Sequence, residues 1–130
     1  MTICELTTRS NGFYAVTAQV RAAVEASGVQ EGICTVYCPH TTAGIAINEN
    51  ADPDVQRDLG YAYGVTFPDR AEFQHFEGNS AAHLKAVVTG ASESIPVSGG
   101  KLMLGRWQGI YFAEFDGPRN RKFYVQVVGK

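Results

Sequence analysis

Residues 109–128 read GIYFAEFDGPRNRKFYVQVV, in which two runs rich in β-branched and aromatic residues flank a turn signal. The first run spans 109–115, the second spans 122–128, and Asp116-Gly117-Pro118 lies between them. This pattern predicts two strands joined as a hairpin, with the charged residues of the turn in solvent. Shorter runs of the same kind predict further strands at 3–8, 13–17, 32–39, 44–48, 94–97 and 101–104.

Helical signals occur at three places between these strands. Apolar residues follow a helical period up to Gly28. Asp52-Pro53 opens a second helix, with a capping carboxylate before proline at the first helical position, and Gly64 ends it. A third helix ends at Gly90. About three helices and seven or eight strands in this order predict one α+β domain over residues 1–130, built around a largely antiparallel sheet or sandwich.

Length, charge and cysteine content limit the class of protein. A chain of 130 residues fits one domain, and a net charge of −2 argues against nucleic acid or membrane surfaces as partners. The three cysteines match neither a disulfide framework nor a zinc knuckle, which indicates reduced thiols. Neither a signal peptide nor a membrane-spanning run is visible, so we expect a cytoplasmic protein.

All three histidines lie in polar clusters at the ends of predicted elements. His40 begins the first cluster, residues 40–50, and His75 and His83 bound the second, residues 75–83. Three protein ligands with one open position are typical of catalytic zinc, and neutral imidazole is a common zinc ligand. No diagnostic ligand spacing is present, however, so the more ordinary interpretation of each histidine is a hydrogen-bonded polar residue.

Other residues of the two clusters also have both functional and structural interpretations. Glu49 and Glu77 are candidate general bases or partners that orient an imidazole, or simply solvated carboxylates. Asn79 and Ser80 are candidate caps of the third helix, where free N–H groups also suit an anion. The remaining candidates for binding a substrate in these clusters are Thr41, Thr42 and Asn48.

Two arginines, Arg119 and Arg121, follow the turn at 116–118 and lie on one face if the segment is extended. Guanidinium groups match phosphate oxygens through paired hydrogen bonds, so this pair predicts an anion site. On that hypothesis, alanine at either position weakens phosphate binding and leaves the melting temperature nearly unchanged. The alternative is that both arginines are solvated charges of a turn.

Several motifs, taken in order along the chain, form a recognisable set. They are His40-Thr41-Thr42-Ala43, Asn48-Glu49-Asn50, Asp54, Asp58, His75-x-Glu77-Gly78-Asn79-Ser80-x-x-His83, Gly90, Leu104-Gly105-x-Trp107-Gln108 and Asp116-Gly117-Pro118-Arg119-x-Arg121. Together they resemble the signature of the YjbQ family, whose members are often labelled secondary thiamine-phosphate synthase enzymes. The resemblance spans nearly the whole chain, and one departure is Arg106, where a small residue such as threonine is usual.

The resemblance implies an α+β fold with a β-sandwich or barrel-like core, and a homotrimer with sites near subunit boundaries. It also implies that His40, His75 and His83 form a metal-type site, for which a zinc-like divalent ion is the expected cofactor. Family members are described as supporting formation of thiamine phosphate, by joining a pyrimidine diphosphate to a thiazole phosphate.

Three functions are compatible with these residues. The first is a transferase acting on a small phosphorylated substrate, with the histidines, Glu49 and Glu77 as catalytic residues and the two arginines neutralising charge. Diphosphate is usually bound together with Mg²⁺, which prefers oxygen ligands. A site of three histidines therefore fits a reaction of diphosphate imperfectly. The second is a metal-dependent hydrolase of a small phosphorylated substrate. The third is a non-enzymatic trimeric protein that holds a metal or a ligand.

Overall fold

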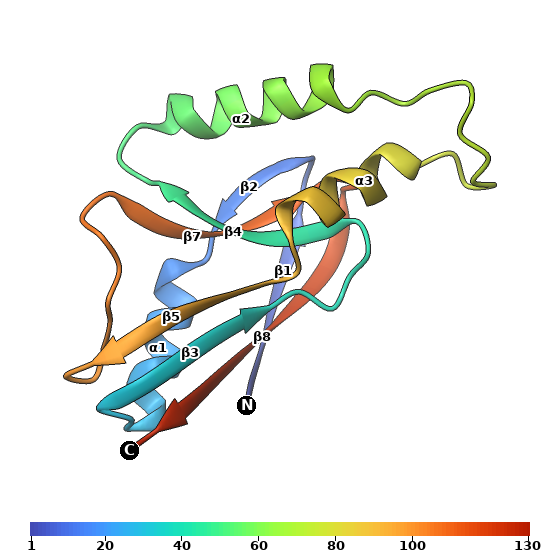
Figure 1. The fold of residues 1–130 in the computed structure, drawn as a ribbon. Helices are drawn as coiled ribbons and strands as arrows, with labels where there is room; N and C mark the ends of the chain where they lie inside the picture. The colour runs from blue at the N-terminus through green and yellow to red at the C-terminus, as the bar shows by residue number, and fades with distance from the viewer.

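Two curled antiparallel sheets account for most of the chain in the computed structural model, which describes residues 1–130 (Figure 1). The elements are β1 (Thr2–Thr8), β2 (Gly12–Ala15), α1 (Thr17–Ser27), β3 (Glu31–Tyr37), β4 (Ala43–Glu49), α2 (Pro53–Thr66), α3 (Ser80–Thr89), β5 (Ser92–Ser98), β6 (Lys101–Leu102), β7 (Gln108–Glu114) and β8 (Arg119–Gly129). The larger sheet has the order β1-β8-β3-β5-β6, and the smaller sheet has the order β2-β7-β4. This arrangement confirms the predicted α+β class.

The strands β7 and β8 lie in different sheets, so the hairpin predicted for residues 109–128 is wrong. β7 pairs with β2 and β4, whereas β8 pairs with β1 and β3. β7 is buried from Gly109 to Glu114, which requires a strand on each side and cover on both faces. Gly117 permits the crossing between sheets, because a Cβ there would lie 3.0 Å from Cγ of Glu114 and 3.1 Å from Oγ1 of Thr8.

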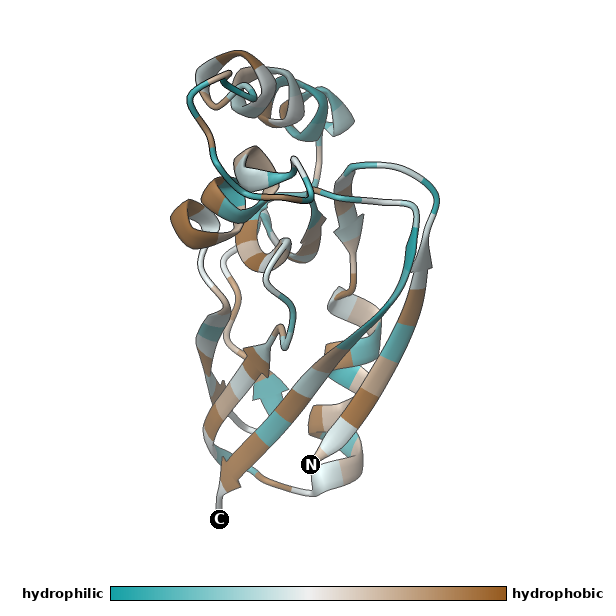
Figure 2. Ribbon diagram, turned by 90° about the vertical axis from the view of Figure 1, so that its right-hand side faces the viewer, coloured by the Kyte–Doolittle hydropathy of each residue, from teal (hydrophilic) through white to brown (hydrophobic).

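The main core lies between the two sheets and α1. In β3, Cys34 and Val36 are fully buried while Ile33 and Tyr37 are exposed, which is the alternation of a strand with one face toward the core. Figure 2 shows such alternation as bands of opposite hydropathy along the long strands. The buried side chains of β3 therefore fix the position of the strand end, and with it the place where His40 follows.

The helix ends follow capping chemistry in part. α1 ends at Gly28, whose left-handed φ of 71° suits glycine, as predicted. α2 begins at Asp52, whose carboxylate accepts a hydrogen bond from the N–H of Asp54, again as predicted. α2 then continues past its predicted end at Gly64 to Thr66, because one glycine costs a helix only about 1 kcal/mol.

The helices α2 and α3 lie together at the end of the molecule next to the smaller sheet (Figure 1). α3 buries Ala82 and Ala86 against a small second core, whereas α2 has no buried residue. The ring of Tyr63 attaches α2 to the body through contacts with Phe13 and Phe115. None of the three helices has both the length and the apolar character needed to cross a bilayer.

Candidate functional site

A buried ion pair stands where the chain crosses between the sheets. Glu114 ends β7 and Arg121 lies near the start of β8, and the two residues are 0% and 6% exposed. Nε of Arg121 donates to Oε1 of Glu114 over 2.8 Å, and Nη2 donates to Oε2. These two hydrogen bonds make the bidentate ion pair that guanidinium and carboxylate groups commonly form.

Further donors surround the Glu114 carboxylate. The hydroxyl of Thr8 donates to Oε1 over 2.8 Å, and the backbone N–H of Asp116 donates to Oε2 over 3.0 Å. Burial by itself would raise the pKa of Glu114, but the hydrogen bonds from Arg121, Thr8 and Asp116 outweigh it and lower the pKa. Glu114 is therefore ionised at neutral pH and balances the charge of Arg121.

A second, more exposed pair lies beside the first. Nε and Nη2 of Arg119 donate to the backbone oxygen and Oδ2 of Asp116, each over 2.8 Å. The amide of Asn79 donates to the same Oδ2 over 2.9 Å. Burial raises the pKa of Asp116, but these bonds from Asn79 and Arg119 lower it further, so its carboxylate is ionised.

Asn79 occupies the N-cap position of α3, as predicted, but its side chain makes no capping bond because it reaches to Asp116 instead. Its other amide atom, Oδ1, is buried without a hydrogen-bond partner. The N–H of Ala82 donates to the backbone oxygen of Asn79 over 3.0 Å, so the N–H groups of Ser80 and Ala81 are the ones left without an acceptor at this helix start.

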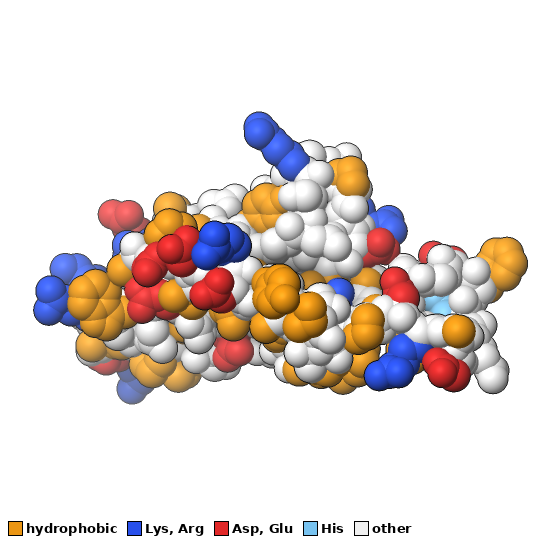
Figure 3. Space-filling view, turned by 90° about the horizontal axis from the view of Figure 1, so that it is seen from above, with side chains coloured by type: hydrophobic (Ala, Val, Ile, Leu, Met, Phe, Trp, Pro, Cys, Tyr) orange, Lys and Arg blue, Asp and Glu red, His pale blue; other side chains and the backbone are white.

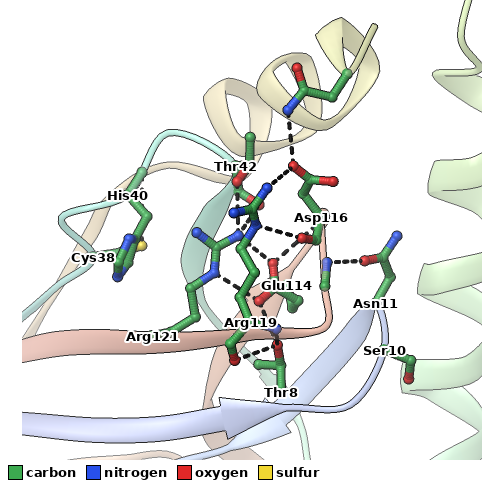
Figure 4. A network of polar contacts seen from close by, with 12 residues as sticks. Thr8, Ser10, Asn11, Cys38, His40, Thr42, Glu114, Asp116, Arg119 and Arg121 are labelled. Carbon is green, nitrogen blue, oxygen red and sulfur yellow. Dashed lines mark hydrogen bonds and ion pairs between the residues drawn. The ribbon is translucent and has the colours of Figure 1, made fainter. Parts of the chain in front are cut away.

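The two arginines share one feature: Nε and Nη2 are both held, while Nη1 makes no hydrogen bond within the chain. Both lie on one face of the extended strand β8, as predicted from their spacing. Figure 4 shows the two guanidinium groups beside each other, between His40 and the two acidic residues. Arg121 also donates to the hydroxyl of Thr42 over 2.8 Å.

Arg121 is not a solvated turn charge, and its burial predicts a lower melting temperature for the alanine variant in place of an unchanged one. Its side chain is 5% exposed, whereas that of Arg119 is 49% exposed. The sequence pattern placed both on one face, but it did not reveal that Glu114 lies beneath that face.

His40 lies beyond the end of β3, and its Nε2 makes one hydrogen bond to the backbone of Lys122 in β8, since a single ring nitrogen either donates or accepts. Nε2 is 3.0 Å from the backbone N of Lys122 and 3.1 Å from the backbone O of the same residue. Burial, followed by the nearby charge of Arg121, lowers the pKa of His40, so its imidazole is neutral at pH 7. Because Nε2 faces β8, Nδ1 is the nitrogen left for other contacts.

His75 and His83 form a pair of neighbouring rings. Their ring centroids lie 5.2 Å apart and their planes are nearly perpendicular, at 86°. His83 belongs to the first turn of α3, and His75 lies in the loop of residues 67–79 between α2 and α3.

One open pocket of about 360 Å³ brings these groups together. Its lining is polar and charged apart from Pro39, and it contains nine of the twelve predicted site residues and also Asp116. The nine are His40, Thr41, Thr42, His75, Glu77, Asn79, His83, Arg119 and Arg121.

The other three predicted residues do not line the pocket. Ser80 begins α3 just outside it. Asn48 and Glu49 lie at the far end of β4, roughly 20 Å from its start at the usual rise of a strand. There the Glu49 carboxylate accepts hydrogen bonds from the N–H groups of Ala51 and Asp52, which stabilises the entry to α2.

Glu114 is the functional residue that sequence reasoning missed. It stands in the run GIYFAEF, where it is the one charged residue among apolar neighbours. Charged residues are almost never fully buried unless they are paired, so that run contained the signal for a buried partner. The identity of the partner, seven residues later in another sheet, could not be read from it.

The chain as it stands does not hold a preformed metal centre. No three His, Cys, Asp or Glu side chains are arranged to hold an ion, so His40, His75 and His83 share a pocket without converging at ligand distance. Cys38 is not a substitute ligand, because burial raises the pKa of its thiol to about 11.

Comparison with known proteins identifies the family. The model of the family described as UPF0047 protein YjbQ-like matches residues 2–130. The chain belongs to the YjbQ family. The UPF0047 protein YugU of Bacillus subtilis is 48% identical over 124 residues, which cover 95% of this chain and 94% of that one. The UPF0047 protein MJ1081 of Methanocaldococcus jannaschii is 50% identical over 114 residues, covering 88% and 83%.

A solved structure extends the likeness to three dimensions. A YjbQ/UPF0047 family protein from Clostridium acetobutylicum is 50% identical to this YjbQ-family chain and superposes with a TM-score of 0.96, covering 98% of this chain and 100% of that one. The family predicted from the motifs is therefore confirmed. The names of these relatives state a family and no reaction.

Proposed function

We propose that the pocket binds the phosphate or diphosphate group of a small molecule and transfers a group to or from it. The observation that carries this proposal is the pair of free Nη1 groups. Arg119 and Arg121 each have two nitrogens fixed by Asp116 and Glu114, which leaves one donor edge of each for a ligand. Fixed guanidinium groups lose little freedom on binding, so they suit an anion better than flexible side chains do.

Two other groups support an anion in the same place. Asn79, the N-cap residue of α3, lines the pocket, so the positive end of the helix dipole lies beside it. The hydroxyl of Thr41 is exposed at the pocket and offers one more donor.

The reaction that fits best is a transfer in which diphosphate leaves. A ring nitrogen of the acceptor would form a bond to carbon as the bond from that carbon to the diphosphate oxygen breaks. The diphosphate keeps the electron pair, and the arginines stabilise its charge. His83, with His75 beside it, would supply the proton that the departing diphosphate takes up. Formation of thiamine phosphate, which the resemblance implies, is a transfer of this kind.

A zinc-like divalent ion at the three histidines is a separate proposal. The three imidazoles fit such an ion by their chemistry, since imidazole is a common zinc ligand. Their positions in the structure do not fit it, because they are not arranged around one point. Binding would require the three imidazoles to come closer together, and no step above depends on the metal. Zinc titration of the chain and of a His75→Ala variant decides the matter, since zinc affinity unchanged by the variant would contradict it.

We also propose the homotrimer that the resemblance implies, in the cytoplasm. Exposed apolar side chains support self-association, and the most exposed on the two helices are Tyr61, Val65, Val87 and Val88. Figure 3 looks onto the α2 side of the molecule and shows hydrophobic side chains exposed there. Light scattering in dilute solution should give three times the mass of one chain, and a stable monomer would contradict the proposal.

The direct test of anion binding is calorimetric titration with pyrophosphate. Arg119→Ala should lower the affinity about tenfold to a hundredfold, the loss expected for one or two hydrogen bonds between charged groups. The matched control is Arg57→Ala, which removes an equally charged, exposed side chain outside the pocket. Equal affinities for the two variants would contradict the proposal.

A further inference from the structure

Asp116 connects the two ends of the pocket through one oxygen atom. Its Oδ2 accepts hydrogen bonds from Nη2 of Arg119 over 2.8 Å and from the side-chain amide of Asn79 over 2.9 Å. Arg119 belongs to β8, whereas Asn79 is the N-cap residue of α3, the helix that carries His83. Figure 4 shows the carboxylate of Asp116 between Arg119 and this helix. The arginine and the helix are therefore held by the same atom.

The side chain of Asn79 bonds to Asp116 in preference to the contacts that an N-cap asparagine usually makes. It makes no capping bond, and its Oδ1 is buried without a hydrogen-bond partner. A buried polar atom without a partner is uncommon in native proteins and lowers stability. Turning the amide over would point Oδ1 at the ionised carboxylate, and two acceptors repel each other. The charge of Asp116 therefore fixes the direction of this amide.

Arg119 depends on this support more than its neighbour Arg121 does. The side chain of Arg121 is 5% exposed and is held by both Glu114 and Thr42. The side chain of Arg119 is 49% exposed, and it bonds to Asp116 alone. Exposed ion pairs restrain their partners weakly, because water competes for the same groups. A carboxylate that a second donor holds in place has fewer orientations, so it restrains the guanidinium group better.

We infer that Asn79 is a positioning residue, which fixes the carboxylate of Asp116 and through it the direction of the free Nη1 edge of Arg119. This role rests on the proposed function, since that edge is one of the two that hold the phosphate group. Asn79 is then the support of an arginine that binds the ligand, and not itself a contact of the ligand.

Asn79→Ser separates this role from helix capping. Serine is a favoured N-cap residue, so the melting temperature should stay within about 3 °C of that of the unaltered chain. The serine side chain is one bond shorter than that of asparagine, so the contact with Asp116 is lost. Calorimetric titration should show about fivefold weaker binding of pyrophosphate, as expected for the loss of one hydrogen bond. The matched control Asn50→Ser, outside the pocket, should bind as the unaltered chain does.

A double-mutant cycle shows whether the effect passes through the carboxylate. In an Asp116→Ala background, Asn79→Ser should cause no further loss of affinity, because the group on which it acts is already absent. An equal loss in both backgrounds would make Asn79 a direct contact of the ligand and would overturn the inference. Unaltered affinity of Asn79→Ser in the natural background would overturn it as well.

Hydrogen exchange of the arginine Nε–H groups, followed by NMR without ligand, tests the positioning separately from the proposed function. The Nε–H of Arg119, which donates to the backbone oxygen of Asp116, should exchange about threefold or more faster in Asn79→Ser, because its bond opens more often. The Nε–H of Arg121, which donates to Glu114, should keep its rate. If pyrophosphate fails to bind the unaltered chain, the proposed function is wrong, and faster exchange at Arg119 would still support the positioning. An unchanged exchange rate at Arg119 would overturn it.

Discussion

Replacing Arg121 by alanine should lower the melting temperature by about 10–20 °C. The substitution leaves the carboxylate of Glu114 buried with no cation, and such a loss typically costs about 3–5 kcal/mol. It also removes the bond to the hydroxyl of Thr42. Differential scanning calorimetry of the purified variant measures the shift directly.

Two variants control for this effect. Arg119→Ala removes a half-exposed arginine from the same strand face and should lower the melting temperature by only a few degrees. The double variant Glu114→Leu with Arg121→Met replaces the buried pair by apolar groups of similar volume and should recover most of the stability. A melting temperature for Arg121→Ala within about 3 °C of the unaltered chain would contradict the buried pair described above.

Replacing His83 by alanine should lower the turnover number about a hundredfold or more, because a positioned proton carrier typically contributes a factor of this size. The measurement is the rate of thiamine phosphate formation from the pyrimidine diphosphate and the thiazole phosphate at saturating concentrations. The affinity for pyrophosphate should change little, since the arginines and not His83 hold that group.

The control is Lys85→Ala, two residues further along the same helix and outside the pocket. Unaltered turnover in His83→Ala would show that this imidazole carries no proton in the reaction. Absence of any product with the unaltered chain would refute the transfer proposed here and leave the binding proposal to be judged by titration.

Local patterns predicted the strands and helices well because each is decided by neighbouring residues. The alternation in β3 and the cap at Asp52 depend on contacts within a few residues. Strand pairing depends on residues that lie far apart in the sequence. The turn at residues 116–118 connects strands of two different sheets, whereas the sequence pattern predicts a hairpin there. A glycine and a proline mark a change of direction without specifying which strand lies alongside.

The candidate site was predictable to a similar extent. The polar clusters that contain the histidines and the arginines meet in one pocket because each stands at an end of a regular element. Glu49 was grouped with His40 because the two are close in sequence, but the extended strand β4 carries it to the opposite end of the sheet. Glu114 was missed because its role depends on a partner in another sheet.

The central claim is that the free edges of two anchored arginines hold a phosphate group, and a crystal structure of the chain with pyrophosphate tests it most directly. One phosphate group should lie with its oxygens about 2.7–2.9 Å from Nη1 of both Arg119 and Arg121, while Asp116 and Glu114 keep their bonds to Nε and Nη2. Pyrophosphate bound elsewhere on the chain, or bound in the pocket without contact to either Nη1, would contradict the account.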